Sequence, residues 1–314
     1  MAENAATREA YPVALEELVD DGVDIVAVDA DLGASTMGQK FGEKFPERWF
    51  SVGVAEQNMV GIAAGLAAAG RTAFIASFSA FLPGRCFDQL RTSVAQPAGG
   101  LNVKCVASHG GVTAGEDGMS AQAIEDVALA SSLISFNVVV PADYEEARQA
   151  ILAVGKANGP AYVRTGRPKV PGLFDSGYRF ELGKAALLRE GTDVTFVACG
   201  VMVVVAIEAA ERLAAEGISA RVLNQASIKP IDREAIIAAA VDTGAVVTAE
   251  EHQTIGGLGS AVARVLAEAE PVPAAFVGVD SYGTSGTWTE LLDHFELTPA
   301  RLVQAARDVL ARKA

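Results

Sequence analysis

Residues 103–118 read VKCVASHGGVTAGEDG, and this stretch shows the pattern that decides the fold. A short apolar run, residues 103–108, leads into a loop of glycine and polar residues that begins at His109. A continuous apolar run of this length is typical of a strand in a parallel sheet whose two faces are both covered by helices. Ligands of such sheets lie beyond the carboxyl ends of the strands, so the loop at His109 is a candidate site.

The same pattern recurs along the chain in two groups, separated by a stretch with two prolines and two glycines, TGRPKVPGL at residues 165–173. Alanine- and leucine-rich stretches of helical character lie between the apolar runs. The predicted strands are residues 24–29, 72–77, 103–108, 136–140 and 161–164, then 194–199, 220–223, 245–249 and 275–279. We therefore predict an α/β protein with two successive parallel-sheet domains, residues 1–168 and 184–314, joined by a linker at 169–183.

Composition excludes several classes of protein. Half of the 314 residues are hydrophobic, which allows a large core and argues against disorder. The net charge of −14 argues against binding to nucleic acid or to an anionic membrane surface. With three cysteines and three histidines, and no CxxC, we expect no metal site in this chain. The longest nearly apolar run, residues 194–207, is shorter than the ~20 residues of a membrane span, and no secretion signal is evident, so we expect a cytoplasmic protein.

Glu56 and two aromatic residues stand out as candidates for chemistry. Glu56 opens an otherwise apolar helix, where it is either a carboxylate favoured by the helix dipole or a partly desolvated acid that shares a proton near neutrality. Phe78 and Phe81 lie three residues apart, directly after a predicted strand. They are either core residues or a pair that flanks a flat heteroaromatic ring.

Four further segments have both a structural and a functional interpretation. His109 lies among glycines, which indicates backbone freedom rather than a packed core. Asp117 belongs to a Glu-Asp-Gly sequence that is also compatible with a plain turn. Arg164 and Arg167 follow a predicted strand, where a guanidinium either binds a phosphate or forms a salt bridge. The glycines of residues 256–259 lack the GxGxxG spacing, which favours tight strand–helix packing over a nucleotide-binding module.

Taken together and in order, these segments resemble the transketolase family. The resemblance covers essentially the whole chain and is to the pyrimidine-binding domain of that family followed by its C-terminal domain. It rests on Asp29-Ala-Asp31-Leu32, FSVGVAEQNM at residues 50–59, Phe78 and Phe81, His109 with Gly115-Glu116-Asp117-Gly118, and Tyr162-Val163-Arg164. Glu250-Glu251-His252, with the glycines that follow, adds a feature shared with deoxyxylulose phosphate synthases and the β subunits of 2-oxoacid dehydrogenases.

The resemblance implies thiamine diphosphate as the cofactor. Glu56 would be catalytic, through a hydrogen bond to the N1′ nitrogen of the aminopyrimidine ring. Phe78 would stack on that ring with Phe81 beside it, and Asp31 would also belong to the cofactor site. The expected fold is therefore the thiamine diphosphate-binding pyrimidine domain followed by the transketolase C-terminal domain.

The resemblance also implies a substrate site. His109 would be catalytic and would face the hydroxyls of the donor sugar or the intermediate. Asp117 would contact a substrate hydroxyl, and Arg164 would bind the phosphate of a sugar phosphate.

The family holds the cofactor diphosphate through Mg²⁺ with a Gly-Asp-Gly motif and a later Asn-Asn, and this sequence has neither. The resemblance therefore implies the C-terminal subunit of a split transketolase that transfers a two-carbon ketol unit between sugar phosphates. A partner subunit with the diphosphate-binding domain would bind Mg²⁺. We expect an α2β2 assembly and no activity of this chain alone.

Departures from the family pattern leave alternatives open. Ala121 stands where the family has a second histidine that holds the C1 hydroxyl of the donor, and Gly84 replaces a frequent tyrosine. The segment Ala55-Glu56-Gln57 is closer to the deoxyxylulose phosphate synthase pattern. The alternatives are an unusual donor, a decarboxylating β subunit that acts on a 2-oxoacid, or a catalytically silent subunit that completes a partner's fold.

Overall fold

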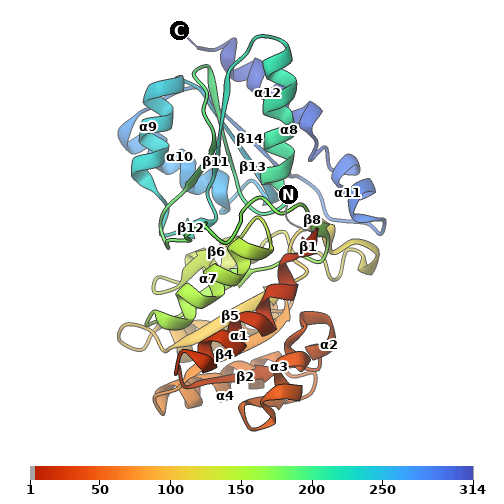
Figure 1. Ribbon diagram of the computed structural model, residues 1–314, viewed down its shortest axis with the longest axis vertical. Coiled ribbons are helices and arrows are strands. Elements are labelled where there is room, and N and C mark those ends of the chain that lie inside the picture. Colours follow the sequence, from red (N-terminus) through yellow and green to blue (C-terminus); the bar gives the residue numbers. More distant parts are fainter. Residues whose placement is uncertain (1–3, 314) are drawn as a thin grey trace.

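Two sheets lie one above the other along the long axis of the computed structural model, which describes residues 4–313 (Figure 1). The first sheet has seven strands in the order β12-β6-β7-β5-β4-β2-β3, all parallel to their neighbours except β12 at one edge. Its first-domain strands are β2 (Ile25–Asp29), β3 (Trp49–Ser51), β4 (Thr72–Phe78), β5 (Val103–Ser108), β6 (Asn137–Val139) and β7 (Ala161–Arg164). Their burial follows from their composition, since every residue of β2, β5 and β7 is buried.

Helices cover both faces of this sheet. One face packs against α1 (Ala10–Asp20), α3 (Gly38–Lys44) and α7 (Tyr144–Lys156). The other packs against α4 (Glu56–Ala68), the π-helical turn η4 (Leu90–Ala95) and α6 (Asp126–Ser132). The short helices α2 (Gly33–Thr36) and α5 (Phe87–Gln89) lie in the loops after β2 and β4.

The second sheet has the order β14-β13-β10-β11-β9, with only β9 antiparallel to its neighbour. Its strands are β9 (Ala186–Arg189), β10 (Val194–Ala198), β11 (Ala220–Asn224), β13 (Val246–Gln253) and β14 (Ala274–Val279). The helices are α8 (Met202–Ala215), α9 (Arg233–Thr243), α10 (Leu258–Ala269), α11 (Trp288–His294) and α12 (Pro299–Leu310). The helices α8 and α12 pack on one face, and α9 and α10 on the other.

The predicted fold class is confirmed: both domains are α/β, and parallel pairing dominates both sheets. All nine predicted strands are present, with small shifts at their ends. The strands that the sequence pattern missed are two to four residues long. Three of them lie at edges of the two large sheets, namely β3, β9 and β12 (Ser227–Lys229), and the other two, β1 (Ala5–Ala6) and β8 (Lys169–Val170), pair antiparallel in a separate two-stranded sheet. Such short edge strands carry too few buried residues to show an apolar run.

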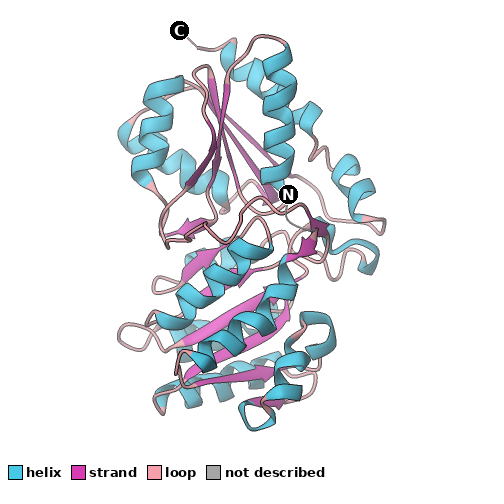
Figure 2. Ribbon diagram, viewed as in Figure 1, coloured by secondary structure: helices cyan, strands magenta, loops and turns pink. Residues whose placement is uncertain are grey.

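One missed strand joins the two domains. Although β12 follows a strand of the second sheet, it pairs antiparallel with β6 of the first, with Ser227 opposite Val139. Figure 2 shows that the region between the two sheets otherwise consists mostly of loops. The apolar core continues through this junction, because the α9–α10 side of the second domain and the α4–α6 side of the first form one cluster. The two domains therefore share a core.

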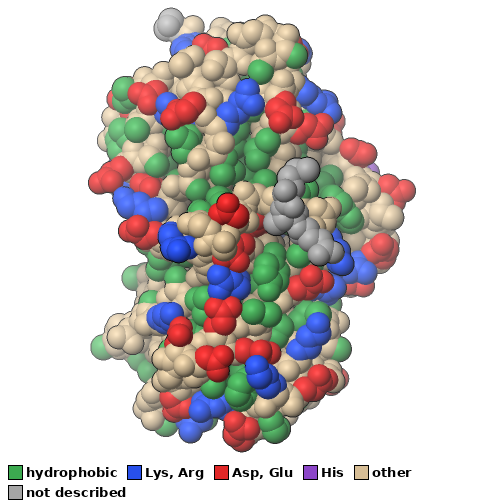
Figure 3. All heavy atoms as spheres, viewed as in Figure 1, with side chains coloured by type: hydrophobic (Ala, Val, Ile, Leu, Met, Phe, Trp, Pro, Cys, Tyr) green, Lys and Arg blue, Asp and Glu red, His purple; other side chains and the backbone are tan. Residues whose placement is uncertain are grey.

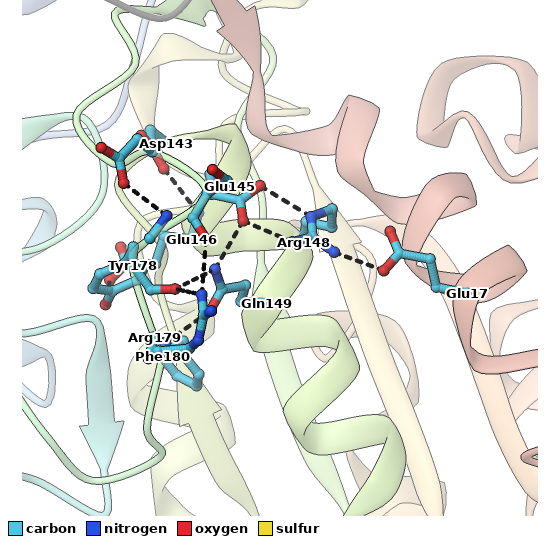
Figure 4. A network of polar contacts seen from close by, with 12 residues as sticks. Glu17, Asp143, Glu145, Glu146, Arg148, Gln149, Tyr178, Arg179 and Phe180 are labelled. Carbon is cyan, nitrogen blue, oxygen red and sulfur yellow. Dashed lines mark hydrogen bonds and ion pairs between the residues drawn. The ribbon is translucent and has the colours of Figure 1, made fainter. Parts of the chain in front are cut away.

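The segment between β8 and β9 contains no helix or strand and is tied to the start of α7 (Figure 4). Asp143 caps α7 by accepting a hydrogen bond from the backbone N–H of Glu146, at 2.8 Å. Its other carboxylate oxygen accepts from the backbone N–H groups of Leu173 (2.7 Å) and Phe174 (2.8 Å). The Tyr178 hydroxyl donates to Glu146, and burial raises the pKa of this glutamate to about 7. A single aspartate thus holds both a helix start and the connecting segment.

We expect Asp143→Ala to lower the free energy of unfolding by about 2 kcal/mol, because it removes a cap and leaves two further N–H groups without an acceptor. The connecting segment should also become sensitive to limited proteolysis near Phe174. Urea denaturation and mass spectrometry of the digest would measure both effects. The matched control is Asp175→Ala, whose carboxylate accepts only from Gly177 within an exposed turn. Equal behaviour of the two variants would contradict this role of Asp143.

The surface carries the charge expected from the composition. On the face shown in Figure 3, acidic and basic side chains are interspersed. Within residues 4–313, no helix combines the length and the apolar character that crossing a bilayer requires.

Candidate functional site

Two neighbouring strands bring the predicted aromatic and histidine residues together. Strands β4 and β5 are parallel, and Phe78 pairs in register with Ser108, so both strands end at the same edge of the sheet. Phe78 and His109 therefore emerge side by side, and their rings stack with centroids 3.9 Å apart. Phe81 lies in the turn after β4 and stacks on Phe78 at 5.6 Å. This arrangement follows from parallel register, which places successive loops at one edge.

Glu56 reaches the same region from the start of α4. Its side chain is only 7% exposed, and its Oε1 accepts a hydrogen bond from Nη1 of Arg85 at 2.9 Å. The Arg85 guanidinium carbon lies 3.7 Å from the centroid of the Phe81 ring. Glu56, Arg85, Phe81, Phe78 and His109 thus form one continuous row of contacts. Arg85 was not predicted as a site residue, because nothing in its local sequence marks it.

Hydrogen bonding determines which ring nitrogen of His109 carries the proton. The side chain of His109 is buried, and its backbone has the left-handed conformation (φ 60°). Nη1 of Arg8 lies 3.2 Å from Nε2 of His109, and a guanidinium can only donate. Nε2 is therefore the acceptor, and Nδ1 carries the proton that it donates to the Ser108 hydroxyl, 2.8 Å away. Burial, followed by the charges of Arg8 and Arg167, lowers the pKa of His109 to about 3. His109 is consequently neutral at physiological pH and accepts at the atom that faces Arg8.

This lowered pKa makes folding stability depend on His109 below about pH 6.5. Between pH 6.5 and the folded-state pKa of about 3, the unfolded chain binds the proton and the folded chain does not. The free energy of unfolding therefore decreases as the pH is lowered through this window. We expect the wild type to lose stability relative to His109→Asn by up to about 1.4 kcal/mol for each pH unit by which the pH is lowered in this window. Asparagine tolerates the left-handed backbone and does not titrate. Urea denaturation from pH 7 to pH 4 measures the difference, and a difference that stays constant with pH would contradict the lowered pKa of His109 in the folded state.

Positive charge gathers around this histidine from distant parts of the chain. Arg8 also donates to the Ser35 carbonyl at 2.9 Å, and Arg167 donates to the Ala114 carbonyl at 2.8 Å and pairs with Glu116. Asp117 is the nearby anion, with Oδ2 4.0 Å from Nε2 of His109, and its side chain is 41% exposed. The region therefore offers two guanidinium groups and a half-exposed carboxylate. The sequence carried no local signal for Arg8, because only the fold brings the amino-terminal segment to His109.

Asp31 lies on the turn after β2, exposed and left-handed (φ 65°). The buried carboxylate of this turn is instead Asp29, which accepts from the backbone N–H of Leu32 at 2.8 Å. Burial raises the pKa of Asp29. Asp29 thus shapes the turn that presents Asp31, and among the described residues no hydrogen bond joins the Asp31 side chain to Glu56. Among residues 4–313, no group of three or more His, Cys, Asp or Glu side chains has an arrangement suited to a metal ion.

Comparison with known proteins identifies the family. Residues 3–172 match the pyrimidine-binding domain of transketolase, and residues 183–302 match the transketolase C-terminal domain. The chain belongs to the transketolase family. It is 45% identical to the 6-deoxy-6-sulfo-D-fructose transketolase subunit SqwH of Clostridium sp. (strain MSTE9), and the match covers 98% of this chain and 95% of that subunit. An apulose-4-phosphate transketolase subunit of Phocaeicola vulgatus is 36% identical, over 99% of this chain and 100% of that protein.

A solved structure gives the same assignment. A split-gene transketolase, an inactive β4 tetramer, matches with a TM-score of 0.90 and 46% identity, over 99% of this chain and 100% of that chain. The chain covers only 49% of transketolase-like protein 2 of Mus musculus, at 35% identity. This member of the transketolase family therefore matches split subunits over nearly their whole length and matches a longer relative over about half of its length.

The predicted phosphate ligand Arg164 lies between the two transketolase domains and is 4% exposed. Its Nη2 donates to the Glu251 carbonyl at 2.8 Å and lies 3.3 Å from Oε1 of that residue, and Nη1 lies 3.8 Å from Oδ1 of Asp126. Although burial acts to lower it, these two carboxylates raise the pKa of Arg164. Contact with a substrate phosphate stays a prediction for Arg164, and its geometry is that of a buried ion pair.

The glycines after His109 make this ion pair possible. A Cβ at Gly110 would overlap Nε of Arg164, and a Cβ at Gly111 (φ 72°) would overlap the Glu251 carboxylate. Glu251 also accepts from the backbone N–H of Thr113 at 3.0 Å. The glycine-rich loop therefore serves the close approach of the two domains as well as presenting His109.

The rest of the Glu-Glu-His segment ties β13 to helix α10 through Glu250 and to the first domain through His252. Glu250 accepts from the first backbone N–H groups of α10, those of Leu258 and Gly259, each at 2.7 Å. A Cβ at Gly257 would overlap the Glu250 carboxylate, which confirms the interpretation of these glycines as tight strand–helix packing. Nε2 of His252 accepts from the backbone N–H of Ala128 in α6, at 3.3 Å.

Ala121 is buried in the loop after Asp117, and its N–H donates to the Gly118 carbonyl at 3.0 Å. The next residue, Gln122, donates from Nε2 to the Thr284 carbonyl of the second domain at 2.8 Å. Where the family resemblance predicts a second histidine, this chain therefore presents only a methyl group.

Proposed function

We propose that this chain is the C-terminal subunit of a split, thiamine diphosphate-dependent transketolase that transfers a two-carbon ketol unit between anionic sugars. The observation that carries the proposal is the buried Glu56 carboxylate at the start of α4, which is linked through Arg85 to the ring of Phe81. A carboxylate so placed can hold a proton on a ring nitrogen. Because the chain belongs to the transketolase family, we propose that this ring is the aminopyrimidine of thiamine diphosphate.

The residues present fit the aminopyrimidine half of this cofactor. Among the described residues, the Glu56 carboxylate has one hydrogen-bond partner, the half-exposed Arg85 side chain, so it has capacity to accept from a ligand. One face of Phe78 is covered by His109, so Phe81 offers the better stacking surface, with Phe78 behind it. Asp31, exposed on its turn, remains a proposed cofactor contact from the family resemblance.

When bound, the cofactor supplies a carbon nucleophile that accepts and releases the two-carbon unit. Glu56 would hold the proton at the N1′ position of the ring, and the burial of its carboxylate keeps that hydrogen bond away from water. Phe81 and Phe78 would fix the plane of the ring. Thus this chain orients and polarises the reacting heterocycle.

A partner subunit would bind the diphosphate and Mg²⁺. Two observations support this: the described residues hold no three-membered acidic or histidine cluster, and the chain matches split subunits over nearly their whole length. We propose an α2β2 assembly in which the cofactor lies between the two kinds of subunit.

The substrate would carry a phosphate or sulfonate group. Arg8, which contacts His109, and Arg167, whose ion pair with Glu116 is at the surface, are candidates for that anion, because the guanidinium of Arg164 is buried and already neutralised by Asp126 and Glu251. Asp117, half-exposed, would accept a hydrogen bond from a substrate hydroxyl. Ala121 lacks the imidazole that the family resemblance places near the donor, so the donor need not be a standard ketose phosphate.

The decisive experiment mixes this chain with its cognate N-terminal subunit, Mg²⁺ and thiamine diphosphate. We expect ketol transfer from a ketose phosphate or a sulfonated ketose to an aldose phosphate, no transfer by either subunit alone, and a mass in light scattering equal to two copies of each subunit. Release of CO₂ from pyruvate without ketol transfer would instead identify a decarboxylating β subunit. A complex with bound cofactor and neither reaction would support a silent subunit.

A further inference from the structure

Arg85 occupies the place that the proposed function assigns to the aminopyrimidine ring. Its guanidinium lies over Phe81, with 3.7 Å between its carbon and the ring centroid, and it donates to Oε1 of Glu56 at 2.9 Å. A bound aminopyrimidine would need the same two contacts, stacking on an aromatic face and a hydrogen bond to Glu56. A guanidinium is itself planar and delocalised, with N–H donors at its edge. The two groups therefore compete for one volume.

The backbone of Arg85 is held, but its side chain is free to move. The carbonyl of Arg85 accepts from Nε2 of Gln57 at 3.0 Å, and its N–H donates to the Phe81 carbonyl at 2.9 Å. The next side chain, Cys86, is fully buried and fixes the turn. The Arg85 side chain, in contrast, is 49% exposed and is tied by a single hydrogen bond and one stacking contact. Its head group can therefore leave without disturbing the fold.

We propose that Arg85 is a latch that closes the cofactor half-site in the free subunit and leaves it when the cofactor and the partner bind. This proposal rests on the proposed function above. In the free chain the latch shields the Phe81 face and satisfies the Glu56 carboxylate. Cofactor binding must then displace both contacts, so the affinity for thiamine diphosphate is lower than that of a site without the latch.

The cofactor arm of the test compares wild type, Arg85→Met and Arg91→Met, each reconstituted with the N-terminal subunit and Mg²⁺. Methionine keeps the length and apolar character of the arginine stem but removes its charge and donors. Arg91 is a matched control, because it is an exposed arginine on the neighbouring turn η4. We expect the Kd of thiamine diphosphate, measured by calorimetry, to fall about tenfold for Arg85→Met and to stay unchanged for Arg91→Met. A tenfold change corresponds to the combined free energy of one exposed cation–π contact and one ion pair, which the cofactor no longer has to displace. An unchanged or higher Kd for Arg85→Met would overturn the latch and place Arg85 elsewhere in the bound site.

The second arm uses the isolated chain and needs no cofactor. A double-mutant cycle of Glu56→Gln and Arg85→Met is followed by the urea midpoint of unfolding. If the two side chains interact, the double variant shifts the midpoint by less than the sum of the single shifts. Additive shifts would overturn the closed state of the latch. A wild-type complex that neither binds the cofactor nor turns over would refute the proposed function and the latch together, whereas turnover with an unchanged Kd for Arg85→Met refutes the latch alone.

Discussion

Glu56→Ala is expected to reduce ketol transfer by the reconstituted enzyme by about 10²–10⁴-fold, the range that a positioned acid–base group contributes. Glu56 is the buried carboxylate of the site, and its hydrogen bond to Arg85 shows that Oε1 points toward the Phe81 face. Among the described residues, no other carboxylate forms an ion pair with Arg85. Glu56→Gln should lose nearly as much, because an amide keeps the shape but cannot hold the proton. Steady-state rates with a ketose donor measure both.

The control for Glu56 is Glu234→Ala, which removes an exposed glutamate from the first turn of another helix, α9. This control should keep full activity, since its carboxylate pairs only with exposed Lys184. Size-exclusion chromatography must show that the Glu56 variants still assemble with the partner. Full activity of an assembled Glu56→Ala enzyme would refute the catalytic role.

Arg164→Met is expected to lower the free energy of unfolding by about 3–5 kcal/mol, because it leaves Asp126 and Glu251 buried without their cation. The cost comes from unpaired carboxylates, and burial already raises the pKa of Glu251. A raised folded-state pKa favours proton uptake by the folded chain. The loss should therefore shrink as the pH falls and Glu251 takes up a proton. Urea denaturation at pH 8 and pH 5 measures both effects.

Two variants make the Arg164 prediction specific. Arg264→Met removes a guanidinium whose side chain is 78% exposed and paired only with Glu268, and should leave the stability nearly unchanged. Adding Asp126→Asn and Glu251→Gln to Arg164→Met should recover part of the loss, since neutral amides need no counter-charge. A loss for Arg164→Met that is no larger than for Arg264→Met would contradict the buried ion pair.

The sequence predicted the fold because the fold is built from strong local patterns. Continuous apolar runs such as residues 103–108 can be buried only in a sheet covered on both faces, and the structure has each of them as a strand. The strands that were missed, β12 above all, are short, and their pairing depends on a distant edge rather than on their own residues.

For the site, the sequence marked residues that follow strands directly, such as Phe78 and His109. Parallel register brings these two together, with rings 3.9 Å apart, so adjacency at strand ends was predictable. Arg8 and Arg85 carried no local signal. They reach the site through folding of remote segments, since Arg8 is 101 residues from His109 and Arg85 is 29 from Glu56.

Sequence alone therefore determined the two α/β domains, the family resemblance and the set of chemically capable residues, because apolar periodicity and ordered motifs are properties of the chain. Only the tertiary structure decided what those residues face. It placed Arg164 between two buried carboxylates, gave His109 a neutral ring that accepts from Arg8, and set Arg85 over Phe81. The physical reason is that charge state and access depend on neighbours from distant parts of the chain, and burial in a folded interior makes those neighbours decisive.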